Sequence, residues 1–177
     1  MIKTEIKFSK DQYEKIRKHL LRGPGEGAAF AFSSFSNAEG SAAITVSAVD
    51  LIPKCECLGE TDYGIELSDI AWNRVMANAF KSKMVLVEMH SHPFSSDNVA
   101  FSPIDINGLK NLVPQLWWRL ENQPYVALVF GRSSVDALLW TDSPEKPQAV
   151  ECLNVEGEKI KPTGLSISYF HRSLKDG

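Results

Sequence analysis

Hydrophobic and polar residues alternate over residues 2–8, and this two-residue period predicts a β-strand. Ser9 follows as a candidate N-cap, and the apolar residues from Tyr13 to Leu21 recur at helical spacing with charged residues between them. Gly23-Pro24-Gly25 then stops the pattern. The chain therefore begins with a strand followed by an amphipathic helix.

Two more strands are predicted after the glycine-rich stop. Small and aromatic residues over 27–32 are typical of a buried strand, and the alternation over 43–49 predicts a second one. A turn around 37–40 separates them, so we expect a hairpin. From Pro53 to Gly64 the pattern has no period, and we expect irregular structure there.

The remaining pattern mixes helices with strands. Ser68 is the N-cap expected for a helix that continues to Phe80. Ser102 and Pro103 begin another helix that continues to Trp117, with Pro114 as the expected position of a kink. Strands are predicted at 84–89, 125–130, 135–140 and, at a sheet edge, 150–155. Loosely alternating helices and hairpins favour an α+β layer structure over a doubly wound one.

Composition narrows the class of protein. The 177 residues suit a single domain, and we expect residues 142–177 to form a C-terminal extension or the start of a linker. The formal net charge is −3 with Lys and Arg scattered, which argues against nucleic acid as a partner. The sequence has no signal-peptide pattern and no apolar run of membrane-spanning length. Three cysteines, an odd and low number, favour a reducing, cytoplasmic setting.

The candidate chemistry is concentrated between His90 and Asp105. His90 and His92 follow an apolar run and, if the strand continues, project to the same side of it. Two imidazoles at that spacing can reach one metal ion, and Asp105 supplies a third possible ligand with a fourth position left for water. Ser102-Pro103-Ile104-Asp105 is equally an ordinary helix start with a cap and an acid in the first turn. The two interpretations are compatible.

This arrangement resembles the JAMM metalloproteases, also called JAB or MPN+ domains. Their pattern is an upstream Glu, then His-x-His-Pro, a short gap, and Ser-x-x-Asp. Glu26, before the small and apolar run at 27–30, matches the first part, His90-Ser91-His92-Pro93 the second, and residues 102–105 the last. The resemblance implies a JAB/MPN-type fold, a mixed sheet of hairpins and central strands packed against flanking helices.

The gap departs from the family pattern. It usually has seven residues, whereas this chain has nine, Pro93 to Phe101, and position 100 is Ala. Two extra residues in a loop cost little closure entropy, so we interpret the gap as a longer loop over the site rather than a broken site.

By resemblance, the site residues acquire roles. His90, His92 and Asp105 would bind one Zn²⁺ per chain, with water as the fourth ligand. Glu26 would act as general base and then general acid, and Ser102 would donate a hydrogen bond to the oxyanion. Glu88 is a rival base because it shares the strand face of the histidines. It could equally be a partner that orients an imidazole, or an exposed acid.

The function that the resemblance implies is a zinc-dependent peptidase or isopeptidase. Its substrate would be a ubiquitin-like protein, or its conjugate, cut at the C-terminal glycine tail. Partners would include activating and conjugating enzymes of the same pathway, with neither nucleic acid nor membrane involved. The alternative is a catalytically inactive MPN-type scaffold that binds protein. An amidohydrolase barrel needs a much longer chain, and a zinc deaminase needs a Cys-x-x-Cys pair that this sequence lacks.

Overall fold

The computed structural model describes residues 3–38, 40–61 and 64–172. The first elements are β1 (Lys3–Phe8), α1 (Lys10–Leu20), β2 (Ala28–Ala38), β3 (Ser41–Leu51), the short 3-10 helix η1 (Lys54–Glu56), β4 (Cys57–Thr61), β5 (Gly64–Leu67) and α2 (Asp69–Ser82). They are followed by β6 (Val85–Ser91), α3 (Pro103–Arg119), β7 (Tyr125–Phe130), β8 (Val135–Trp140), β9 (Gln148–Ala149), β10 (Cys152–Val155), β11 (Glu158–Ile160) and α4 (Leu165–Arg172). The α+β class predicted from the sequence is confirmed.

Nine of the described strands form one mixed sheet in the order β11-β10-β1-β3-β2-β6-β7-β8-β9. β2 and β3 are the predicted antiparallel hairpin, and β7 and β8 form another. Strand β6 lies between them, antiparallel to β2 and parallel to β7. The strand that carries the His-x-His motif is therefore an interior strand, fixed on both sides by backbone hydrogen bonds.

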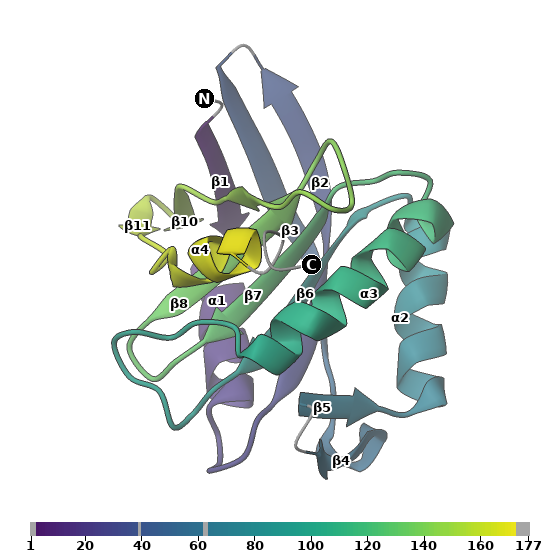
Figure 1. Cartoon of the computed structure of the whole chain (residues 1–177), viewed down its shortest axis with the longest axis vertical. Helices are drawn as coiled ribbons and strands as arrows, with labels where there is room; N and C mark the ends of the chain where they lie inside the picture. Colours follow the sequence, from purple (N-terminus) through teal and green to yellow (C-terminus); the bar gives the residue numbers. More distant parts are fainter. Residues whose placement is uncertain (1–2, 39, 62–63, 173–177) are drawn as a thin grey trace.

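Helices cover both faces of this sheet (Figure 1). Helix α1 packs Tyr13, Ile16 and Leu20 on one face, in a core that includes Leu128 of β7. Helices α2, α3 and α4 cover the other face. Strands β7 and β8 are buried along their whole length because both faces are covered.

The helices begin where the sequence predicts. The hydroxyl of Ser9 accepts a hydrogen bond from the Gln12 amide at 3.2 Å, and that of Ser68 accepts from the Ala71 amide at 3.2 Å. These caps satisfy amides that have no partner inside the helix. Helix α3 continues without a break through Pro114.

Two segments differ from the sequence-based expectation. Residues 53–64 were expected to be irregular, but η1 and β4 lie in this segment, and β4 pairs with β5 as a small antiparallel sheet; residues 62 and 63 lie outside the described part. The hairpin has no signal in the pattern because its strands are short and each contains a glycine. Helix α2 buries Ala71, Val75 and Ala79, whereas its larger apolar residues Ile70 and Phe80 lie exposed instead of in the core.

The C-terminal part is integrated into the domain. Residues 142–177 were expected to be an extension or a linker with one edge strand, whereas their described part supplies β9, β10, β11 and α4. Strand β10 is not an edge strand, because it lies between β1 and β11. Parallel pairing with β1 could not be foreseen, since it joins segments from opposite ends of the chain.

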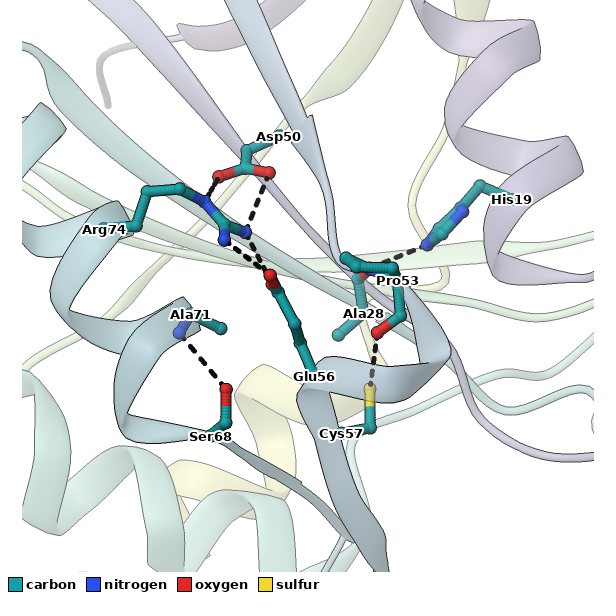
Figure 2. A network of polar contacts seen from close by, with 9 residues as sticks. All are labelled: His19, Ala28, Asp50, Pro53, Glu56, Cys57, Ser68, Ala71 and Arg74. Atoms are coloured by element: carbon teal, nitrogen blue, oxygen red, sulfur yellow. Dashed lines mark hydrogen bonds and ion pairs between the residues drawn. The ribbon is translucent and has the colours of Figure 1, made fainter.

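One arginine ties the β4–β5 insertion to the sheet (Figure 2). Arg74 of α2 donates from Nε to Asp50 Oδ2 at 2.9 Å and from Nη2 to Glu56 Oε2 at 2.7 Å. The Ser68 amide also donates to the Glu56 carbonyl at 2.8 Å. The end of β3, η1 and the start of α2 are thus held as one unit.

Candidate metal centre

The strand geometry sets the direction of both histidines. His90 lies in β6 opposite Ala28 of β2 and Val129 of β7. His92 follows the strand, and its amide continues the pairing by donating to the Phe130 carbonyl at 2.9 Å. Residues two apart along extended chain project to the same side. Their Nε2 atoms lie 3.3 Å apart.

The start of α3 supplies the carboxylate. Asp105 Oδ2 accepts from the Ser102 amide at 2.7 Å, while the Ser102 hydroxyl accepts from the Asp105 amide at 3.2 Å. This reciprocal capping box is the ordinary helix start expected from the sequence. The same Oδ2 atom lies 3.5 Å from His90 Nε2 and 3.3 Å from His92 Nε2. One side chain thus caps the helix and faces the imidazoles.

These three side chains form a set that could hold one metal ion. Their ligand atoms all lie within 4.8 Å of one another, and no other such group of three His, Cys, Asp or Glu residues occurs among the residues that the structure describes. The side chains are 6–12% exposed, so a bound ion would have little competing solvent around its protein ligands. His and carboxylate donors on two rigid elements give the site a fixed shape.

The electrostatics of the triad favour a positive charge. Burial alone would raise the pKa of Asp105, but hydrogen bonds with His90 and His92 outweigh it and hold that pKa below its usual range. Burial alone would lower the pKa of His90, but the adjacent Asp105 carboxylate and the charge of Glu88 raise it. The carboxylate is therefore ionised and is stabilised by whichever cation occupies the space between the rings, a proton or a metal ion.

Glu26 reaches the same place from the segment before β2. Its Oε1 atom lies 3.5 Å from His92 Nε2. The residue between the histidines fixes this approach: the buried Ser91 hydroxyl accepts from the Gly27 amide at 2.9 Å and donates to the Leu20 carbonyl at 2.7 Å. In the sequence, the only signal for this role of Ser91 is its place between the two histidines of the motif.

Glu88 is placed differently from Glu26. Its carboxylate accepts a hydrogen bond from the phenol of Tyr125. Burial raises the pKa of Glu88, and the Tyr125 hydrogen bond works against that rise. Of the three alternatives left open for Glu88, the exposed acid is excluded because the side chain is partly buried, and no hydrogen bond joins Glu88 to either imidazole within the described ranges. Glu26, which approaches His92, is thus the better placed of the two candidate bases.

The nine-residue loop does not displace the ligands. At its ends, Phe94 stacks on His92 with ring centroids 5.1 Å apart, and Phe101 packs edge-on against His90 at 5.4 Å. Its middle lies on the β7–β8 turn, where Ser96 O accepts from the Ser134 hydroxyl. Gly131 permits this approach because a Cβ there would lie 2.9 Å from the Ser96 carbonyl oxygen. The middle of the loop is thus held against the β7–β8 turn, away from its two ends beside the histidines.

The C-terminal segment holds the other end of the loop. Thr163 Oγ1 donates to the Val99 carbonyl at 2.7 Å, and the Ser166 hydroxyl accepts from the Phe101 amide at 2.9 Å. That segment is fixed in turn by Asp136 of β8, which accepts from the Gly164 and Ser166 amides, each at 2.8 Å. The residue before Ser102 is therefore held by a chain of hydrogen bonds that begins in the sheet.

An apolar cavity of about 380 Å³ adjoins the triad. It is lined from β2, α2 and α3 by Phe30, Trp72 and Leu112, and from β6 by Glu88 and His90. A cavity of this size matches those that receive a side chain or a small ligand. The arrangement combines three side chains that could hold a cation, a nearby carboxylate and an apolar recess.

Comparison with known proteins finds a similar fold but no matching family. No model of a known protein family matches the chain, and no curated protein matches it. The solution structure of protein DSY2949 from Desulfitobacterium hafniense is similar, with a TM-score of 0.51 and 16% sequence identity over 86% of this chain and 95% of that one. At such identity the likeness concerns the fold alone.

The structure brings together the five residues that the sequence singled out, Glu26, His90, His92, Ser102 and Asp105. Their roles stay predictions. Sequence reasoning missed Phe94, Phe101 and Tyr125, since aromatic residues beside a motif are usually core residues.

Within the described part of the chain, no helix is long and apolar enough to cross a membrane.

Proposed function

We propose that this protein is a zinc-dependent peptidase or isopeptidase of the JAMM type, acting on the C-terminal tail of a ubiquitin-like protein. The observation that carries the proposal is the convergence of His90, His92 and Asp105 with the Glu26 carboxylate at one end of β6. The sequence resemblance names the same residues in the same roles. The mixed sheet with helices on both faces is compatible with a JAB/MPN domain.

The spacing of the three donors supports zinc. Ligands at about 2.0–2.1 Å in a tetrahedral site are separated from one another by roughly 3.3–3.4 Å. The three donor separations here are 3.3, 3.5 and 3.3 Å. Two imidazoles and one carboxylate also match the donor types of catalytic zinc sites.

The reaction would divide among few groups. A zinc ion at such a site supplies Lewis acidity, which polarises a carbonyl group and makes water a better nucleophile. Glu26 accepts a proton from the attacking water and delivers it to the amine nitrogen as the C–N bond breaks. Ser102 uses its oxygen to cap α3, which leaves the hydroxyl proton for the oxyanion on the attacked carbonyl.

The first experiment is elemental analysis of the purified protein. We expect about one zinc per chain in the wild type and in the control Asp97→Ala, and loss of zinc in Asp105→Ala. Asp97 is a suitable control because its exposed carboxylate accepts a hydrogen bond from Ser133 of the β7–β8 turn instead. Absence of zinc from the wild type under metal-replete, chelator-free conditions would refute the metal site.

Activity is then tested on fusions that carry a ubiquitin-like tail. The wild type should release the group after the tail glycines, while Glu26→Gln should keep its zinc and lose turnover. Retention of zinc without cleavage of any fusion would instead favour the inactive binding scaffold.

A further inference from the structure

A second cavity lies beside the segment before β2, which carries Glu26. Its volume is about 530 Å³, and it is formed by the end of α1, the segment before β2, and residues that follow β3. Glu26 lines this cavity, whereas His90 and Asp105 line the apolar one. We call it the basic cavity, after its lining residues His19, Arg22 and Lys54.

The basic cavity has a net positive lining. Arg22 and Lys54 are full cations, and Glu26 is the one acid among the described residues that line it. In the described part of the chain, no carboxylate lies within 4.0 Å of either cation. Burial raises the pKa of the Cys57 thiol, another lining group, while the charges of Arg22 and Lys54 both lower it.

His19 completes the lining as a neutral group. Its Nε2 lies 3.1 Å from the Ala28 carbonyl, so it donates there (Figure 2). Burial and the charge of Arg22 lower the pKa of His19, which leaves its ring uncharged at neutral pH. Cys57, another lining residue, points its thiol at the Pro53 carbonyl (Figure 2). The two charges available to a ligand are therefore those of Arg22 and Lys54.

The position of Glu26 assigns a role to this cavity, in an argument that rests on the proposed hydrolase. Glu26 delivers the proton to the leaving amine, so the amine forms beside it. In the proposed reaction the carbonyl group of that bond is acted on by Ser102 and the triad, which lie together at the start of α3 and the end of β6. The residue attached to the amine is then the part of the substrate nearest the basic cavity.

We infer that the basic cavity binds the residue released as the amine, and that Arg22 and Lys54 pair with a carboxylate carried by that residue. The volume lies within the range of small-molecule sites, which accommodates one amino acid with its water. The carboxylate can come from the main chain, when a single amino acid is released, or from an acidic side chain. A lysine side chain of a large conjugate offers neither at that distance.

Three tail peptides test this inference by differing only after the last glycine: alanine with a free carboxylate, alaninamide, and aspartamide. We expect the free-acid peptide to exceed alaninamide in kcat/KM by about tenfold or more, as for a charge-assisted hydrogen bond. If kcat/KM for the aspartamide peptide is also high, a carboxylate on the side chain is sufficient for recognition. If it is as low as for alaninamide, the cavity recognises the main-chain carboxylate.

The variant is Arg22→Gln with Lys54→Gln, and the control is Lys18→Gln with Lys161→Gln, which removes the same charge from exposed positions outside the cavity. The ratio of kcat/KM between acid and amide should fall toward one in the first and stay at the wild-type value in the second. An equal ratio in both, or no preference in the wild type, would overturn the inference.

Failure of the hydrolase is separable from failure of the cavity. If no peptide is cleaved, the proposed function fails, and NMR titration of the same proteins with the same peptides measures binding directly. Tighter binding of the acid, lost in the Arg22/Lys54 variant and kept in the control, would then support the cavity as a carboxylate site. Equal binding of acid and amide would reject it.

Discussion

Asp136 offers a sharp test of how the loop before α3 is held. It lies in β8 and is fully buried, and its carboxylate accepts from the Ala137 amide at 2.9 Å as well as from the Gly164 and Ser166 amides at 2.8 Å. The last two belong to the start of α4 and the turn before it. Replacement by alanine leaves all three donors without their acceptor.

The structure sets the size of the effect. The Ala137 and Ser166 hydrogen bonds are buried, whereas the Gly164 amide is only partly buried and can turn to water. Each buried donor without a partner costs about 1–3 kcal/mol, so Asp136→Ala should destabilise the protein by about 2–6 kcal/mol. A typical domain is stable by about 5–15 kcal/mol, which makes this a large fraction.

Urea unfolding followed by circular dichroism and tryptophan fluorescence measures this loss. The control is Asp142→Ala, whose exposed carboxylate accepts from the Gln148 amide side chain and should matter by no more than about 0.5 kcal/mol. Because Ser166 also accepts from the Phe101 amide, zinc should bind more weakly to the Asp136 variant than to the control. A loss below about 1 kcal/mol would mean that these bonds do not hold the C-terminal segment.

Three further predictions concern a glycine pair, the cap of α3 and an ion pair of α2. Gly131→Ala places a Cβ against loop carbonyls and should lower the free energy of unfolding in urea by about 1–3 kcal/mol. Gly108→Ala, which has open space around it inside α3, should raise that free energy by about 0.5–1 kcal/mol. If Gly108→Ala were the less stable of the two variants, the packing described around Gly131 would be contradicted. Ser102→Ala should cost about 1 kcal/mol of stability and, in the proposed hydrolase, reduce kcat by about 10²-fold or more while zinc is kept. Hydrogen bonding to Arg74 lowers the pKa of Glu56 in the folded protein. The pair therefore stabilises the protein fully at a pH above the ordinary Glu pKa of about 4.3. This stabilisation is lost as the pH falls through the lower pKa of the folded state. The stability lost in Arg74→Met should accordingly be greater at pH 7 than at pH 3, and a loss independent of pH would exclude the ion pair as its cause.

Much of the fold follows from local pattern. The strand at β1, the caps at Ser9 and Ser68, and the hairpin of β7 and β8 were predictable because period, cap and turn are all encoded within about ten residues. The β4–β5 hairpin and the place of β10 were not. The first has short strands with glycine, and the second depends on a partner strand distant in the sequence.

The candidate site divides in the same way. His90 and His92 share a strand face, and Asp105 lies in a first helical turn, so local rules place each of them. Their convergence depends on tertiary contacts that local rules cannot supply. Ser91 accepts a hydrogen bond from Gly27, and Gly131 leaves room for the loop. Neither role can be predicted from the residue type alone.

The parallel pairing of β1 with β10 has a consequence in time. Glu5 lies opposite Cys152, and Asn154 donates to the Glu5 carboxylate at 3.0 Å across a separation of 149 residues. During synthesis one edge of β1 must wait, unpaired and open to other chains, until nearly the whole described chain has left the ribosome. Long-range pairings of this kind slow folding, so the late emergence of β10 limits how soon the second edge of β1 can pair.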